Sequence, residues 1–164
     1  MDPRGNKRPR GTTQASRRNH RVISAIPELV FVDTNVLVYA HDEGDPARNT
    51  IAIATLTKLW ETDTGALSTQ VLQEFYSVAT RKLNMSHAEA RDTVSDFSEW
   101  CATDTDAQLL VSASALCEQY QLSWRDALIV EAALRCGATT LLSEDMRHGQ
   151  TFGSLTIRNP FVES

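Results

Sequence analysis

Apolar residues along the chain alternate between short continuous runs and longer stretches with a helical period. The short runs predict buried strands at residues 29–33, 65–69, 107–112, 138–145 and 154–159. The stretches between them carry an apolar residue every three or four positions, which indicates helices packed on one face. Strands and helices alternate in this way when helices cover both faces of a parallel sheet. The pattern therefore predicts an α/β three-layer sandwich with a mainly parallel central sheet of about five strands.

Helices are predicted at residues 35–41, 45–62, 69–83, 86–100, 113–122 and 123–137. Several of their boundaries carry recognisable signals. Ser86 is followed three residues later by Glu89, which is the spacing of a capping box. Ser123 is expected to cap the last of these helices, and Gly137 lies just past its end, where glycine commonly terminates a helix.

Charge divides the chain into two unequal parts. Residues 1–21 contain seven basic residues and one acidic residue, whereas residues 22–164 contain nine basic and twenty acidic residues. We expect residues 1–21 to form a disordered basic arm, because arginine, proline and glycine are frequent and no apolar period is present. Residues 22–164 are expected to form one acidic globular domain. The arm either neutralises nucleic-acid phosphates or is a dispensable extension.

The cysteines and the apolar runs indicate a cytoplasmic protein. The three cysteines form no C-x-x-C pair, so neither a disulfide framework nor a zinc site is predicted, and they are expected to be small buried side chains. No apolar run approaches the roughly 18 residues of a membrane span. Asp33 interrupts the first apolar run, which argues against a secretory signal peptide.

Two carboxylates follow predicted strands directly. Asp33 ends the first strand, and Asp145 follows the run that ends near residue 142. The carboxyl ends of parallel strands meet at one edge of a sheet, where ligands commonly bind, so both side chains are expected there. Each also has a simpler interpretation, because Asp33 is placed to cap the next helix and Asp145 to be an ordinary loop acid.

Two further acids belong to predicted helices. Asp126 falls in the first turn of its helix, near the middle of the apolar face. An unpaired carboxylate directed inward is costly, so Asp126 is expected to face a cation, although its spacing from Ser123 also fits a capping box. Glu74 lies early in its helix, on the border of the apolar stripe, and carries little weight alone.

A divalent cation is the simplest way to neutralise several carboxylates at one sheet edge. Such carboxylates repel one another, and Lys58 and Lys82, the only lysines after residue 21, are not placed at strand ends. Mg²⁺ prefers oxygen ligands and commonly bridges to phosphates. The sequence therefore predicts that Asp33 ends its strand in order to hold a metal ion.

Three segments resemble a known family. They are VFVDTNVLVYAHD at residues 30–42, WRDALIVEAAL at residues 124–134 and TTLLSEDMRHG at residues 139–149. With Glu74 between the first two, this order resembles PIN-domain ribonucleases, specifically toxins of the VapC type, over roughly residues 28–162. The resemblance implies a cytoplasmic, Mg²⁺- or Mn²⁺-dependent endoribonuclease that cleaves RNA. It also implies a homodimer that a VapB-like antitoxin protein holds inactive.

The resemblance also assigns roles to individual residues. The acids expected to be catalytic and to bind the metal are Asp33, Glu74, Asp126 and Asp145. The polar residues expected to orient these carboxylates are Thr34, Asn35 and Ser143. The basic residues expected at the rim of the RNA site are Arg81, Lys82 and Arg147.

Two alternatives remain open on the residues alone. A metal-dependent phosphatase of the haloacid-dehalogenase type also begins with a strand that ends in aspartate. That chemistry requires D-x-D, however, and Asn35 stands at the second aspartate position. A non-catalytic binding module with the same fold is the other alternative.

Overall fold

The computed structural model describes residues 26–163, so the basic arm predicted at residues 1–21 lies outside the described residues. Six strands form one sheet: β1 (Val30–Val32), β2 (Gly65–Ser68), β3 (Cys101–Thr103), β4 (Thr140–Leu142), β5 (Thr151–Phe152) and β6 (Leu155–Arg158). Their order across the sheet is β3-β2-β1-β4-β6-β5, and only β5 runs antiparallel to its neighbour. The predicted, mainly parallel sheet is confirmed, with one strand more than expected.

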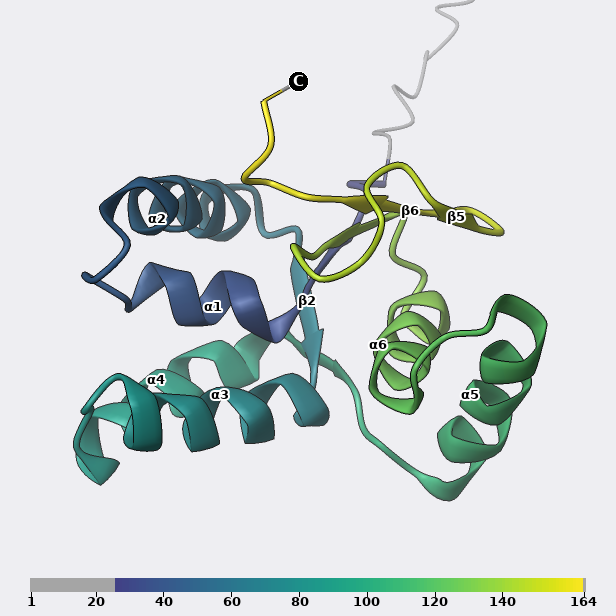
Figure 1. The fold of residues 1–164 in the computed structure, drawn as a ribbon, viewed down its shortest axis with the longest axis horizontal. Helices are drawn as coiled ribbons and strands as arrows, with labels where there is room; N and C mark the ends of the chain where they lie inside the picture. Colours follow the sequence, from purple (N-terminus) through teal and green to yellow (C-terminus); the bar gives the residue numbers. More distant parts are fainter. Residues whose placement is uncertain (1–25, 164) are drawn as a thin grey trace, which may run out of the picture.

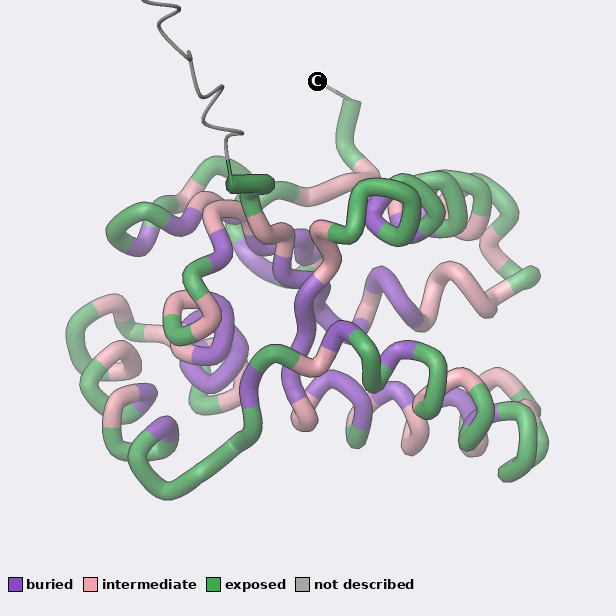
Figure 2. The backbone as a smooth tube through the Cα atoms, turned by 180° about the vertical axis from the view of Figure 1, so that it is seen from behind, coloured by how far each residue is buried: buried purple, intermediate pink, exposed green. Residues whose placement is uncertain are grey.

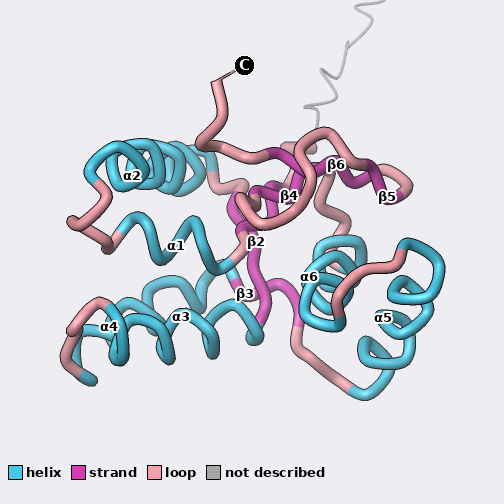
Figure 3. Tube along the Cα trace, viewed as in Figure 1, coloured by secondary structure: helices cyan, strands magenta, loops and turns pink. Residues whose placement is uncertain are grey.

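In the part of the chain that the structure describes, six α-helices cover the two faces of this sheet. They are α1 (Thr34–Ala40), α2 (Pro46–Thr62), α3 (Thr69–Lys82), α4 (His87–Phe97), α5 (Ala107–Tyr120) and α6 (Trp124–Arg135). A short 3-10 helix, Ser98–Trp100, follows α4. Figure 1 shows α1 to α4 on one side of the sheet and α5 and α6 on the other, which is the predicted three-layer sandwich. Figure 3 shows that all six helices lie outside the central strands.

One predicted strand was wrong. Residues 107–112 form the first turns of α5, and the third strand is instead Cys101–Thr103. Asp106 starts the helix because its carboxylate accepts a hydrogen bond from the backbone N–H of Leu109 at 2.8 Å. The apolar run is not buried throughout, since Leu109 is buried whereas Val111 is exposed, as in a helix with one inward face. The two-residue strand β5 was also not predicted.

The predicted helix boundaries are confirmed where caps were expected. Ser86 and Glu89 form a reciprocal capping box at the start of α4. The hydroxyl of Ser123 accepts a hydrogen bond from the backbone N–H of Asp126 at the start of α6. Gly137 follows α6 with φ of 77°, in the left-handed region that glycine adopts without strain.

The core is centred on the middle strands, as the buried colouring in Figure 2 shows. Phe31 and Val32 of β1 have no exposed surface. Because β1 is flanked by strands on both sides and helices on both faces, the residue after it is also enclosed. Asp33 consequently has no exposed surface either. Among the described residues, no helix is long and apolar enough to cross a membrane.

Candidate active site

Asp33 is held at the carboxyl end of the central strand by donors that belong to the fold itself. Its Oδ1 accepts a hydrogen bond from the backbone N–H of Thr34 at 2.7 Å, so Asp33 does cap α1. Its Oδ2 accepts a hydrogen bond from the hydroxyl of Ser143 at 2.8 Å. The capping interpretation and the site interpretation are compatible, because Oδ1 accepts the capping hydrogen bond and still has a second acceptor position, and Oδ2 is not used for capping.

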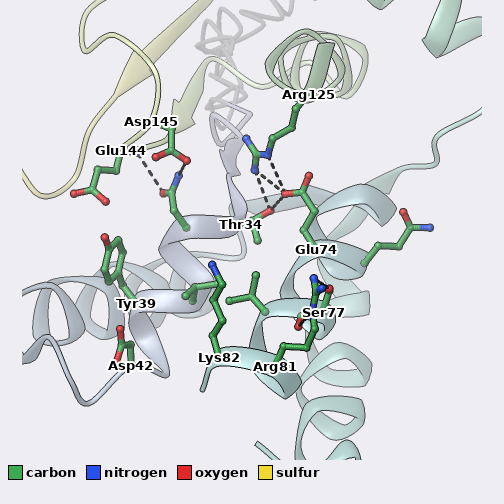
Figure 4. Close-up of a pocket in the computed structure, with 14 residues that line it drawn as sticks. Thr34, Tyr39, Asp42, Glu74, Ser77, Arg81, Lys82, Arg125, Glu144 and Asp145 are labelled. Carbon is green, nitrogen blue, oxygen red and sulfur yellow. Dashed lines mark hydrogen bonds and ion pairs between the residues drawn. The ribbon is translucent and has the colours of Figure 1, made fainter. Parts of the chain in front are cut away.

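Arg125, at the start of α6, connects three of the predicted acids. Its Nη2 lies 2.8 Å from Oδ1 of Asp33 and 2.6 Å from Oε2 of Glu74. Its Nη1 lies 3.3 Å from Oδ1 of Asp126. Figure 4 shows this guanidinium directed toward Glu74 and Thr34 at one end of a groove. One cation thus draws together carboxylates from the end of β1, from α3 and from α6.

Arg125 is the member of the candidate site that the sequence predictions missed. The predicted neutralising groups were a metal ion or lysines at strand ends, whereas Arg125 lies on a helix. The available signal was the adjacency in W-R-D, which places Arg125 directly before the acid expected to face a cation. Asp126 does face a cation, and that cation is the guanidinium of its own neighbour.

Glu74 is positioned by neighbours on two elements. The hydroxyl of Thr34 donates to its Oε2 at 2.6 Å, and the amide of Gln70, one turn earlier on α3, donates to its Oε1 at 3.1 Å. Thr34 therefore contacts one of the acids that it was expected to orient. These contacts fix a half-buried carboxylate that carried little weight in the sequence.

Asp145 joins the cluster through Asn35 and not through Arg125. The amide nitrogen of Asn35 donates to Oδ2 of Asp145 at 3.1 Å, and its carbonyl oxygen accepts from the backbone N–H of Glu144 at 3.2 Å. Ser143 binds both acids, because its hydroxyl donates to Asp33 and accepts from the backbone N–H of Asp145 at 3.2 Å. Asn35 and Ser143 thus link the fourth acid to the other three.

The electrostatics of the cluster differ from one acid to the next. Burial raises the pKa of Asp33, against the opposing hydrogen bonds from Arg125 and Ser143. Burial also acts to raise the pKa of Glu74, but the hydrogen bonds from Arg125 and Thr34 outweigh it and leave that pKa below its usual value. Burial alone would lower the pKa of Arg125, yet Asp33 and Glu74 raise it further above its ordinary value. Arg125 is therefore a permanent cation.

A groove of about 650 Å³ opens beside the acids. Its lining includes Glu74, Arg125 and Asp145 near the cluster, and Arg81 and Lys82 at the opposite end (Figure 4). Two of the three basic residues predicted at the rim therefore line this groove. The third, Arg147, does not, because it lines a separate small pocket on the loop with His148 and Gln150.

The donor chemistry of the cluster fits a hard divalent cation, since every acid offers carboxylate oxygens. Within residues 26–163, however, no three acidic, histidine or cysteine side chains stand together in an arrangement that could hold a metal ion. Asp33, Glu74 and Asp126 are instead arranged around the guanidinium of Arg125. The three carboxylates therefore suit a cation, and the guanidinium of Arg125 occupies the position between them.

The chain belongs to the PIN domain family, whose model matches residues 30–151. Solved structures with the same fold include VapBC2 from Rickettsia felis bound to a DNA fragment from its promoter. That match has 22% identity and a TM-score of 0.55, and it covers 80% of this chain and 98% of the other. The sarcin-ricin loop cleaving toxin VapC20 of Mycobacterium tuberculosis matches at 20% identity and a TM-score of 0.55, covering 71% of this chain and 89% of the other.

A toxin–antitoxin complex from Klebsiella pneumoniae gives a third match, with 16% identity and a TM-score of 0.56, covering 80% of this chain and 97% of the other. No curated protein sequence matches the chain significantly. At these identities the solved structures establish the fold alone. They agree with the family that the sequence segments resembled.

Proposed function

We propose that the chain is a Mg²⁺- or Mn²⁺-dependent endoribonuclease that hydrolyses RNA phosphodiester bonds. The observation that carries the proposal is the meeting of Asp33, Glu74 and Asp126 around one cation at the carboxyl end of the central strand. These acids come from three separate elements, and a purely structural ion pair needs only one of them. The groove beside them, with Arg81 and Lys82 at its far end, offers room and positive charge for an RNA strand.

In this proposal the four acids have distinct roles. Asp33 and Asp126 would hold the metal most directly, and Glu74 would complete its binding. Asp145, which Asn35 orients, would position the attacking water and take up its proton. When bound, the metal ion would polarise the phosphate and lower the pKa of a bound water. Direct attack by water leaves a 5′-phosphate and a 3′-hydroxyl on the products.

We further propose that the enzyme is the toxin of a toxin–antitoxin pair. Two of the solved structures with this fold are a VapBC2 structure and a toxin–antitoxin complex. By analogy, a cognate VapB-like antitoxin would be the partner, and the active form would be a cytoplasmic homodimer. The groove offers the antitoxin a site in which it would compete with RNA.

The experiment that tests the enzyme proposal is RNA cleavage by the purified, partner-free chain. Total RNA is incubated with Mg²⁺ or Mn²⁺, or with EDTA, and with the variants Asp33→Ala and Asp126→Ala. We expect metal-dependent cleavage that falls by roughly 100-fold or more in both variants, beyond the cost of losing a supporting residue. Asp92→Asn is the control, because Asp92 is exposed on α4 and does not line the groove.

A phosphomonoester control separates the alternatives. Release of phosphate with intact RNA would favour the phosphatase, although the second acid of its D-x-D motif is absent and Asn35 at that position donates to Asp145. No turnover of either substrate in any condition would favour a non-catalytic binding module. Cleavage that persists in EDTA, or in both aspartate variants, would contradict the metal-dependent mechanism.

A further inference from the structure

The guanidinium of Arg125 uses the oxygens that a metal ion would need. Its Nη2 binds Asp33 and Glu74, its Nε binds Oε2 of Glu74 at 3.2 Å, and its Nη1 binds Asp126. A guanidinium and a divalent ion cannot share the same position among three carboxylates. One has to leave before the other binds.

We propose that Arg125 is a built-in competitor of the divalent metal, which holds the acids together without metal and must swing away when metal binds. This inference rests on the proposed function, because it assigns a regulatory role at the same site. The affinity of the site for the metal then depends on Arg125 as well as on the acids. The enzyme is then held in a metal-free, inactive state until the metal concentration overcomes the arginine.

The partners of Asp33 show which donor has to give way. Oδ1 accepts from the backbone N–H of Thr34 as well as from Arg125, and Oδ2 accepts from the hydroxyl of Ser143. The backbone of Thr34 is fixed at the start of α1, and Ser143 is fully buried. Arg125 is the one strong donor to Asp33 that sits on a long side chain, so it is the donor that a metal ion would displace.

Arg125 also has a route out of the cluster. Its side chain is 35% exposed and lines the groove, whereas Asp33 beside it has no exposed surface. A rotation about its side-chain bonds therefore carries the charge toward solvent without breaking the core. Replacement of the guanidinium by the metal is electrostatically favourable, because a divalent ion offsets the repulsion among three carboxylates more fully than one guanidinium does.

The test measures Mn²⁺ binding to the metal-stripped chain by calorimetry, with RNA absent. Arg125→Met removes the competitor, and Arg125→Lys keeps one charge but lacks the fork of donors. Arg135→Met is the matched control, because Arg135 also lies on α6, is 30% exposed and pairs with Asp106 away from the site. We expect Arg125→Met to bind Mn²⁺ about tenfold or more tightly than the wild type, Arg125→Lys to fall between them, and Arg135→Met to match the wild type.

Thermal unfolding gives a second readout. In EDTA, Arg125→Met should melt below the wild type, because three carboxylates are left without a cation, and Mn²⁺ should raise its melting temperature more than that of the wild type. Should the methionine variant not fold without metal, Arg125→Lys still decides the question through its affinity. An affinity for Mn²⁺ that is unchanged or weaker in both Arg125 variants, or an absence of Mn²⁺ binding in all proteins, would overturn the competition.

RNA cleavage by the wild type, measured in parallel, separates the two proposals. Metal-dependent cleavage without tighter Mn²⁺ binding in the Arg125 variants would leave the nuclease standing and remove the competition. Tighter Mn²⁺ binding in these variants without any cleavage would keep the competition and remove the nuclease.

Discussion

The guanidinium of Arg125 binds the fully buried carboxylate of Asp33 at 2.8 Å, although 92 positions separate the two residues in the chain. The pair fastens the start of α6 to the end of β1. A buried ion pair adds little net stability over an apolar pair of the same size, since desolvation opposes its attraction, whereas removal of one partner alone is costly. Single substitutions in this cluster are therefore expected to have measurable effects.

Glu74 should make the stability of the metal-free protein depend on acid pH. Its pKa is lowered in the folded protein, so its ionised form stabilises the fold at pH values above 4.5, the ordinary value, and this stabilisation is lost as the pH falls through the lowered pKa. Glu74→Gln removes the charge. In EDTA we expect the wild type to be more stable than Glu74→Gln by about 1.5–3 kcal/mol near neutral pH, the usual contribution of a hydrogen bond to a charged group.

The difference between the wild type and Glu74→Gln should shrink when thermal unfolding is followed to pH values below the lowered pKa of Glu74, because both side chains are then uncharged. A difference in melting temperature that stays constant over this range would show that Glu74 contributes through packing and not through its ionised form. Gln70→Ala should have a smaller effect, since Gln70 gives Glu74 a single hydrogen bond of 3.1 Å from an uncharged amide.

Asn35 should affect activity far more than stability. Asn35→Ala removes the donor that holds Asp145 and the acceptor for the backbone of Glu144. We expect kcat/KM for RNA cleavage to fall about 10- to 100-fold, as for other residues that orient metal ligands. Asn49→Ala is the control, because its amide bonds only the backbone carbonyl of Tyr39, away from the acids. Equal activity losses in the two variants would argue against a positioning role for Asn35.

Arg81 and Lys82 should control how RNA binding depends on salt. Both line the groove, and each contact to a phosphate of a single strand contributes about −0.7 to the slope of log K against log salt. Replacing either residue with glutamine should weaken binding of a non-cleavable RNA and reduce the magnitude of the slope by about 0.7. Arg91→Gln, on the exposed side of α4, should leave the slope unchanged. If the slopes of the Arg81 and Lys82 variants equal that of the wild type, the RNA binds outside the groove.

Local patterns predicted most of the fold because they report directly on burial and on helix ends. The capping box at Ser86 and the cap at Ser123 are set by neighbours three residues away, so the sequence alone reveals them. The misassigned strand at residues 107–112 shows the limit of this approach. A short segment with apolar residues at its centre fits a buried strand and an amphipathic helix equally well, and here it follows a helix cap at Asp106.

The candidate site also has one part that local patterns predict and another part that they do not. Asp33 and Asp145 were predictable because parallel strands bring their carboxyl ends together. The link from Asp145 through Asn35, and the place of Arg125 among three acids, depend on side-chain directions on elements far apart in the sequence. No periodicity encodes such directions, so the cation that neutralises the acids was found only in the structure.

Gly65 should be intolerant of even one added methyl group. A Cβ atom at Gly65 would stand 2.6 Å from the ring of Trp100, nearer than such atoms approach in real proteins. Trp100 cannot easily retreat, because its ring packs against Trp60 at 4.4 Å and Phe97 at 5.2 Å. We expect Gly65→Ala to lower the free energy of unfolding by about 1–3 kcal/mol, the usual cost of overpacking, and to alter the tryptophan fluorescence of the folded state. Gly44→Ala, in an exposed loop, should cost less, because its Cβ would meet only the end of the Asp42 side chain, at 3.0 Å. Equal effects of the two substitutions would mean that β2 and Trp100 can move apart to accommodate the added methyl group. The close contact between Gly65 and the Trp100 ring would then not be important for stability.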